Sequence, residues 1–426
     1  MNILFLCHRI PFPPDKGDKI RAYHMLAHLA REHTIHLGAF VEDPAEMRHQ
    51  ARLREMIGGE CHLEPLGSVA RLKMAAALVH GAPLSASYFE SSRLAGWVDR
   101  ILRAHNIESV VVFSTAMAPY LLRQRGFDLR RVIFDMVDVD SDKWRQYAGT
   151  ASGLLAWIYR REMRTLLSLE REAASKFGAT LLVSEHEANT FAQLAPFARQ
   201  RLWSVPNGVD LDFFAPEQSY RNPFGPNELP IVMTGTMGYR PNAEGAAWFA
   251  TSVFPLIRAR KPNAKFYVVG ASPTGNVKAL AGPSVVVTGK VDDVRPYLAH
   301  AAAAVAPLQL ARGVQNKVLE AMAMAKPVIA TSPAVQALEV SSGKELFVAD
   351  EPVDFAQALV RMNVSDAERP LAIARIDKRN GIAGLHAGEQ RGIDWDRIFR
   401  VEWSVARHQP HACGFGDLSH GVAGRP

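Results

Sequence analysis

The sequence predicts an α/β fold in which two doubly wound parallel sheets follow one another along the chain. Three observations lead to this prediction. The chain has 426 residues, more than one typical domain and suitable for two. Short apolar segments alternate with amphipathic helical segments, as in parallel sheets covered by helices. The alternation stops in a polar stretch with four prolines at residues 216–230 and then begins again.

Composition and charge restrict the function classes. Hydrophobic residues make up 48% and charged residues 22% of the chain, which allows two sizeable cores. The net charge of +6 suits phosphate-rich ligands or anionic membranes. Without a basic run or an RNA-binding signature, we expect no nucleic-acid partner. Three cysteines make no disulfide framework, and no signal peptide or apolar run of about 18 residues is present, so we expect a cytoplasmic protein.

Apolar runs in the first half predict five strands, which lie at residues 3–6, 34–41, 108–113, 131–138 and 179–184. A glycine-containing loop at 11–19 leads from the first strand into a helix, whose start is a possible anion site. We expect Arg21, near this helix start, to be a solvated charge. A long helix is predicted at 152–177.

The second half repeats the alternation. Strands are predicted at residues 231–234, 265–270, 285–288, 301–308, 328–330 and 345–349, and helices at 243–260, 316–326 and 352–362. The helix at 316–326 ends before Pro327, which cannot continue it.

The stretch at residues 308–331 carries the strongest functional pattern. Gly313 frees the backbone before a helix whose N–H groups suit phosphate binding. Lys317 adds a full charge in the first turn of the helix. Glu320 lies three residues further on the same side, where its carboxylate can accept hydrogen bonds from the ribose hydroxyl groups. An ordinary helix with a glycine entry and solvated charges explains the same residues, and both interpretations remain open at this point.

Two further patterns have competing interpretations. Asp138-Val-Asp140 matches a D-x-D metal motif, but it also fits a strand end with Asp138 or Asp140 on the acceptor side, which we favour. The apolar segment 69–82 and the basic, aromatic first half of the helix at 152–177 suit either a membrane surface or ordinary packing.

Several motifs resemble those of a known family. Lys317-x-x-Glu320-Ala-Met-Ala, followed by Lys326-Pro-Val, resembles the nucleotide-sugar signature of glycosyltransferase family 4, the retaining enzymes of GT-B fold. Pro206-Asn-Gly-Val-Asp210 resembles the interdomain motif of that family. Residues 17–21 and 135–144 resemble the exopolysaccharide sugar transferases that accompany PEP-CTERM/exosortase systems.

The resemblance implies two Rossmann-like domains that face each other across a cleft. Residues 1–204 would form the acceptor domain and residues 205–393 the nucleotide-sugar domain. A helix at 394–405 would cross back, and residues 406–426 would be a loose tail. The implied reaction moves a sugar from a nucleotide diphosphate to a hydroxyl group with retention. The implied setting is exopolysaccharide biosynthesis, as a hexosyltransferase acting on a sugar or lipid-linked oligosaccharide, with possible peripheral contact at the inner face of the cell membrane.

The resemblance also implies a site. Lys317 and Arg240 would neutralise the diphosphate, Glu320 would bind the ribose, and no metal or other cofactor would be needed. Asp138 would lie on the acceptor side. The donor contacts would be completed by Gly17, Gly238, Val291, Arg312, Gly313, Asn316 and Val318. Arg312 stands where the family usually has a glutamate, and because arginine only donates hydrogen bonds we expect it to influence sugar choice.

Two alternatives come from other classes of protein. A GT-B sugar-nucleotide epimerase would use the same nucleotide pocket without an acceptor. A non-catalytic nucleotide-sugar-binding protein would fit the missing glutamate at Arg312. An NAD oxidoreductase is disfavoured, because the G-x-G-x-x-G fingerprint is absent.

Overall fold

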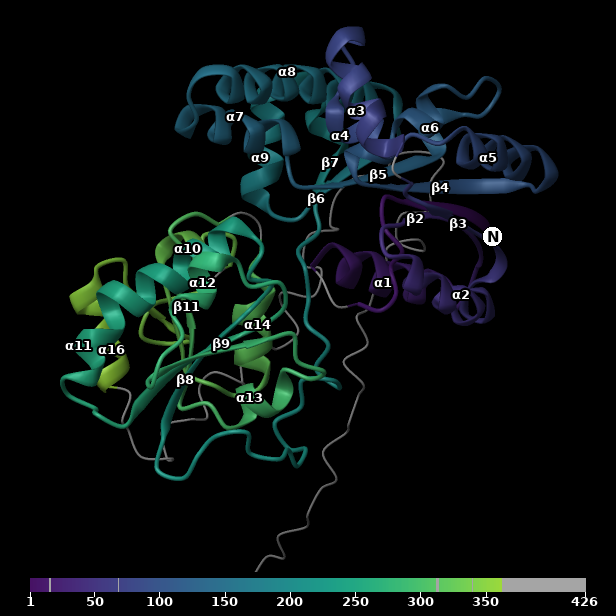
Figure 1. Cartoon of the computed structure of the whole chain (residues 1–426). Helices are drawn as coiled ribbons and strands as arrows, with labels where there is room; N and C mark the ends of the chain where they lie inside the picture. The colour runs from purple at the N-terminus through teal and green to yellow at the C-terminus, as the bar shows by residue number, and fades with distance from the viewer. Residues whose placement is uncertain (15–16, 68, 312–313, 339, 362–426) are drawn as a thin grey trace, which may run out of the picture.

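The chain folds into two parallel sheets with helices on both faces of each sheet (Figure 1). The computed structural model describes residues 1–14, 17–67, 69–311, 314–338 and 340–361. The predicted doubly wound α/β architecture is therefore confirmed for both halves. The helix predicted at 394–405 and the tail predicted at 406–426 lie outside the described residues.

The first sheet has seven parallel strands in the order β3-β2-β1-β4-β5-β6-β7. Their bounds are β1 Asn2–Cys7, β2 Thr34–Val41, β3 Gly58–Pro65, β4 Ile107–Phe113, β5 Val132–Val137, β6 Ala179–Leu182 and β7 Leu202–Ser204. The strand order reverses between β1 and β4. β1 lies between β2 and β4 and pairs with both of them in parallel. In open α/β sheets, ligands bind beyond the carboxyl ends of the strands at such a reversal.

The second sheet repeats this plan with six strands in the order β10-β9-β8-β11-β12-β13. Their bounds are β8 Leu229–Thr234, β9 Ala264–Val269, β10 Val285–Gly289, β11 Ala303–Ala306, β12 Val328–Ala330 and β13 Phe347–Val348. Here the order reverses between β8 and β11, so the carboxyl ends of these two strands mark the corresponding place in the second half.

Helices connect successive strands. In the first half they are α1 Gly17–Leu29, α2 Gln50–Ile57, α3 Val69–His80, α4 Leu84–Tyr88, α5 Ser92–Ala104, α6 Pro119–Leu122, α7 Asp140–Thr150, α8 Gly153–Lys176 and α9 Glu185–Leu194. In the second half they are α10 Arg240–Trp248, α11 Phe254–Arg258, α12 Gly275–Lys278, α13 Arg295–Ala299, α14 Asn316–Ala323, α15 Ser332–Val335 and α16 Pro352–Arg361.

Burial explains why the central strands are apolar throughout. Along β1, Leu4 and Leu6 belong to the core on one face of the sheet, whereas Ile3 and Phe5 belong to the core on the other. Side chains alternate across a strand, so a sheet covered on both faces needs apolar residues at every position. This is the pattern from which the strands were predicted.

The edge strands depart from this pattern. We did not predict β3 or β7. The sequence of β3, Gly-Gly-Glu-Cys-His-Leu-Glu-Pro, buries only Cys61 and Leu63, because one of its edges and much of one face lie at the surface. The strand β7 is three residues long and only half-buried, which gives too short an apolar run to detect.

The two halves meet through a small apolar cluster and through the connecting segment, residues 205–228, which runs from β7 to β8. Val183, which follows β6, packs with Val314 and Leu319 of the second half. Nearby, the side-chain amide of Asn207 donates to Oδ1 of Asn316 at 3.4 Å. The start of α14 is therefore in contact with both the first half and the connecting segment.

Candidate active site

The start of α14 lies at the strand-order reversal of the second sheet, beside the loop that follows β8. Gly235 directly follows β8 and has φ of +147°, a backbone conformation that suits glycine. A Cβ atom at this position would lie 2.8 Å from Nδ2 of Asn242 and 3.4 Å from Cε of Lys317. The backbone after β8 thus approaches the Lys317 side chain closely, and a larger residue at position 235 would displace it.

Lys317 and Glu320 share the first turns of α14, and burial shifts both of their pKa values towards neutrality. Burial lowers the pKa of Lys317 to about 8, although Glu320 opposes this shift. Burial raises the pKa of Glu320 to about 7, with Lys317 opposing. Nζ of Lys317 donates to Oε1 of Gln315 at 3.2 Å. Gln315 is also the N-cap residue, and its side chain makes no capping hydrogen bond to the helix, so the helix start retains donors for a ligand.

Arg240 opens α10, on the loop side of β8, and its side chain is 56% exposed. Its Nε donates to Oε1 of Glu244 at 2.7 Å, and this hydrogen bond is the main cause that raises the pKa of Arg240. Tyr147 and Tyr159, from the first half, make smaller contributions in the same direction. To act with Lys317 on a diphosphate, the guanidinium would have to turn away from Glu244 or bind Glu244 and the diphosphate at the same time.

The glycines predicted to approach a donor lie in loops at the carboxyl ends of strands. Gly17 opens α1, and a Cβ atom there would lie 3.8 Å from Nδ2 of Asn316, so the glycine approaches the start of α14. Gly238 follows β8, and a Cβ atom there would lie 3.1 Å from the carbonyl oxygen of Ser272. The structure thus brings Gly17 and Asn316 together, whereas Gly238 lies against the loop that follows β9.

The two predicted valines both pack against the core of the second half. Val318 is fully buried in the core, and its N–H donates to the carbonyl oxygen of Gln315, so the structure does not present it to a donor. Val291 follows β10 and packs partly buried against the same core. Arg312 and Gly313 lie outside the described residues.

Asp138 lies directly after β5, where the backbone turns sharply. Val137 has φ of +68°, a strained conformation for a β-branched residue, and the N–H of Asp138 donates to the carbonyl oxygen of Met136 at 3.0 Å. Asp140 then opens α7 and lies 4.0 Å from Nζ of Lys143. A lysine beside Asp140 supplies a positive charge, which weakens the D-x-D metal interpretation.

Two buried glutamates hold the turn after Asp138. Oε2 of Glu187 accepts the N–H of Val139 at 2.8 Å. Glu170 accepts both the N–H of Ser141 at 3.0 Å and its hydroxyl group at 2.5 Å. Burial raises the pKa of Glu170 to about 8, although the hydrogen bonds from Ser141 oppose the shift. The backbone that presents Asp138 is therefore fixed by side chains from α8 and α9.

Arg21 is not the solvated charge that we predicted. Its guanidinium is buried and makes two hydrogen bonds to the fully buried Asp135 on β5, at 2.8 and 3.1 Å. It also donates to the carbonyl oxygen of Val205 at 2.7 Å and to Oδ1 of Asn207 at 3.1 Å. A single arginine thus joins α1, β5 and the connecting segment.

Sequence reasoning missed the structural roles of Glu170 and Asp135, although a signal exists for each. Glu170 occupies the buried face of α8, four residues after Leu166 and three before Ala173. A carboxylate at a core-facing helix position indicates a buried hydrogen-bonding role. For Asp135 the signal is an acidic residue inside an apolar strand, and Arg21 is its long-range partner, which no local pattern identifies.

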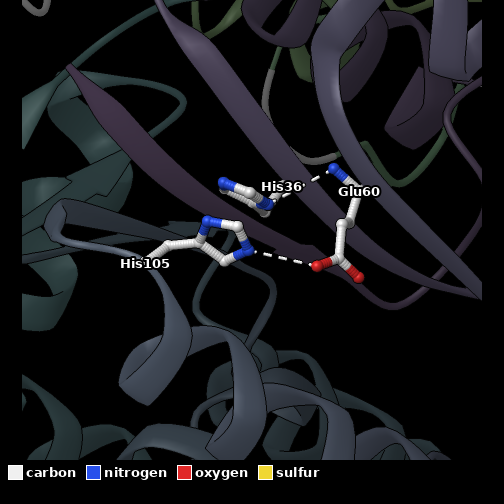
Figure 2. Close-up of side chains that lie close together, drawn as sticks. All are labelled: His36, Glu60 and His105. Atoms are coloured by element: carbon white, nitrogen blue, oxygen red, sulfur yellow. Dashed lines mark hydrogen bonds and ion pairs between the residues drawn. The ribbon is translucent and has the colours of Figure 1, made fainter.

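One group of side chains in the described ranges has the spacing of a possible metal site (Figure 2). This group lies at the β3 edge of the first sheet, far along the strand order from β5. It consists of His36, Glu60 and His105. Both carboxylate oxygens of Glu60 accept hydrogen bonds from Arg100, at 3.0 and 2.8 Å. Nδ1 of His36 already accepts the N–H of Glu60. A cation would have to displace the guanidinium, so we interpret the group as an ion-paired cluster.

A protein-family model matches most of the second half. Residues 228–363, which contain Arg240, Lys317 and Glu320, match the family model described as Glycosyl transferases group 1. No curated protein matches the chain in sequence.

Solved structures extend the similarity to both halves. Anabaena HepE, in complex with UDP and glucose, is 17% identical, with a TM-score of 0.56 over 87% of this chain and 92% of that chain. WaaG, a glycosyltransferase involved in lipopolysaccharide biosynthesis, is 16% identical, with a TM-score of 0.60 over 87% and 92%. Sucrose-phosphate synthase from Thermosynechococcus elongatus is 16% identical, with a TM-score of 0.58 over 87% and 91%. The chain has the GT-B fold of these glycosyltransferases, as predicted.

Proposed function

We propose that the chain is a glycosyltransferase that moves a sugar from a nucleotide-diphosphate donor to a hydroxyl acceptor with retention of configuration. The observation that carries the proposal is the start of α14. There, Lys317 and Glu320 lie at the strand-order reversal of a Glycosyl transferases group 1 domain, beside the glycine loop after β8. This is where open α/β sheets bind nucleotides.

The chemistry assigns a role to each residue. The bond between the sugar and the diphosphate breaks, a bond to the acceptor oxygen forms, and the acceptor proton is released. Negative charge grows on the departing diphosphate, so cations fixed there lower the barrier. Lys317 and Arg240 supply this charge, together with the N–H groups at the start of α14. Glu320 accepts hydrogen bonds from the ribose, and no metal is required.

The donor to test first is a uridine-diphosphate sugar, because the similar HepE structures contain UDP or UDP-glucose. The acceptor side is assigned to the β5–α7 turn, where Asp138 is held beyond the carboxyl end of its strand. The acceptor that we propose is a sugar or lipid-linked oligosaccharide of bacterial exopolysaccharide biosynthesis, reached from the cytoplasmic side of the membrane.

Exposed apolar residues on α3 and α8 support peripheral contact with that membrane. Leu72 and Val79 on α3, and Leu154 and Trp157 on α8, are 69%, 83%, 73% and 52% exposed. The two helices are joined, because Arg161 of α8 donates to the carbonyl oxygens of Ala77 and Ala82. Arg160 and Arg164 add exposed positive charge on α8. A cationic, apolar surface suits anionic lipid, and none of the described helices is long and apolar enough to cross a bilayer.

The function is tested by incubating the purified chain with nucleotide sugars and a membrane extract that supplies acceptors. We expect release of nucleoside diphosphate that depends on the acceptor, with the sugar recovered in the lipid-linked fraction. Lys317→Ala should abolish most of it, and Lys278→Ala, which removes an exposed lysine of the same domain, should not. Conversion of the donor to an epimer without acceptor would instead establish the epimerase alternative, and binding without any turnover would establish a non-catalytic protein.

A further inference from the structure

A continuous set of polar contacts joins the core of the first half to the helix that we assign to the donor. It begins at Asp135, which is fully buried on β5 and ion-paired with Arg21 of α1. Arg21 continues it to the connecting segment through Val205 and Asn207. Asn207 ends it at Asn316, the first residue of α14. The members come from four parts of the fold, and their contacts tie together β5, α1, the connecting segment and α14.

Apolar packing alone fixes the approach of the two halves only loosely at this place. The apolar cluster between them has three buried members, Val183, Val314 and Leu319. Apolar contacts are non-directional, whereas a guanidinium presents its donors in a rigid fork of fixed geometry. Arg21 places one edge of this fork, Nε and NH2, on the Asp135 carboxylate and NH1 on two acceptors of the connecting segment.

We propose that Arg21 is a positioning residue that, through Asn207, sets where α14 lies relative to the acceptor-side half of the chain. The inference rests on the proposed glycosyl transfer. Arg21 does not touch the donor in this account. It fixes the register between Lys317 on α14 and the turn after β5, the strand that carries its partner Asp135. Misplacing reacting groups by about 1 Å can cost ~10²-fold in rate, so this register matters for turnover.

The account separates two measurable quantities. The nucleotide contacts are assigned to Lys317 and Glu320, whereas the hydrogen bonds of Arg21 go to Asp135, Val205 and Asn207. Transfer needs both halves in register. Arg21→Lys keeps a positive charge for Asp135 but lacks the fork, and Asn207→Ala removes the bridge to Asn316 while leaving the Arg21–Asp135 pair intact. We therefore expect each substitution to lower kcat by ~10-fold or more and to leave the Kd of the free nucleoside diphosphate within about twofold.

A double substitution sharpens the test. Because both side chains act through the same contact, the Arg21→Lys, Asn207→Ala variant should lose no more of kcat than the more damaging single variant. The matched control is Arg100→Lys. It disrupts another two-bond arginine–carboxylate pair of the first half, with Glu60, at the far edge of the sheet. We expect this control to keep its kcat.

A second measurement keeps the inference independent of catalysis. Fluorophores at Arg103→Cys and Arg260→Cys, in a Cys413→Ser background, would report the distance between the halves. Both labelled positions are exposed, and Cys7 and Cys61 are buried. We expect a broader distance distribution in Arg21→Lys and Asn207→Ala than in the parent or in Arg100→Lys. Unchanged distributions together with unchanged kcat, or losses of kcat that multiply in the double variant, would overturn the proposal.

A parent protein that neither binds nucleotide nor transfers sugar would overturn the proposed function, and the distance distributions would still decide the role of Arg21.

Discussion

The two sides of the proposed active site are built in opposite ways. On the acceptor side, the turn after β5 is fixed by buried carboxylates, with Glu187 holding Val139 and Glu170 holding Ser141. On the donor side, Lys317 and Glu320 lie at the start of α14, where the Lys317 ammonium donates to the neutral side-chain amide of Gln315. The carboxyl groups of the first region accept hydrogen bonds from the backbone of that region. In the second region, we expect Lys317 and Glu320 to bind the donor.

This difference shows which charges are structural and which are available for a ligand. A buried charge normally has a partner, because an unpaired one is costly. Asp135 and Arg21 meet that requirement as a pair within the first half. At the start of α14, burial lowers the pKa of Lys317 and raises that of Glu320. An anion beside Lys317 and a sugar hydroxyl group beside Glu320 would stabilise the charged forms of these two side chains.

The largest expected effect comes from the donor side. Lys317→Ala removes a charge that is needed more as the diphosphate leaves than while it is bound intact. We expect kcat to fall by ~10²-fold or more, with a smaller change in donor affinity. Steady-state kinetics and calorimetry with the free nucleoside diphosphate measure the two quantities. Near-normal values for both would show that the two sides do not differ as described.

Glu320→Ala should act on binding instead of turnover. A ribose contact is present in both the ground state and the transition state, so its loss weakens binding of the free nucleotide, by ~10-fold for a hydrogen bond to a charged group. The control is a nucleotide that lacks the 2′- and 3′-hydroxyl groups. Wild type and Glu320→Ala should bind it equally, and a persistent difference would place Glu320 away from the ribose.

On the acceptor side, the buried carboxylate of Glu170 should make stability depend on pH. Its pKa is raised from an ordinary value of 4.5 to about 8, mainly by burial. The folded state therefore binds more protons than the unfolded state between these values, and stability is lost as the pH rises through this window. Denaturant unfolding from pH 4.5 to 8 should show this decline, and Glu170→Gln should flatten it. Glu172→Gln, on the exposed face of α8, should leave the slope unchanged.

How far the sequence predicts this molecule depends on the range of the interactions involved. The central strands and the start of α14 were found because periodicity, glycine and proline are local signals. The edge strands β3 and β7 were missed because partial exposure removes the apolar run. Arg21 was misjudged because its partner Asp135 lies 114 residues away, and Val318 because the helix turns that side chain into the core.

The smallest expected effect is that of chelation. With Lys317 and Arg240 neutralising the diphosphate, EDTA should leave the transfer rate within about twofold of the untreated enzyme, since the charge stabilisation does not come from a bound ion. Dialysis against EDTA followed by a transfer assay measures this. Loss of activity that Mg²⁺ or Mn²⁺ restores would assign Asp138 and Asp140 to a metal and remove the contrast between the two sides.

The most direct test of the central claim is a crystal structure of the chain with a nucleoside-diphosphate sugar. We predict that the diphosphate lies at the start of α14, with Nζ of Lys317 at a hydrogen-bonding distance of about 3 Å from a phosphate oxygen and the ribose hydroxyl groups on Glu320. The sugar should point towards the turn that carries Asp138. A nucleotide bound to the first sheet, or bound to the second with Lys317 still on Gln315, would contradict the account.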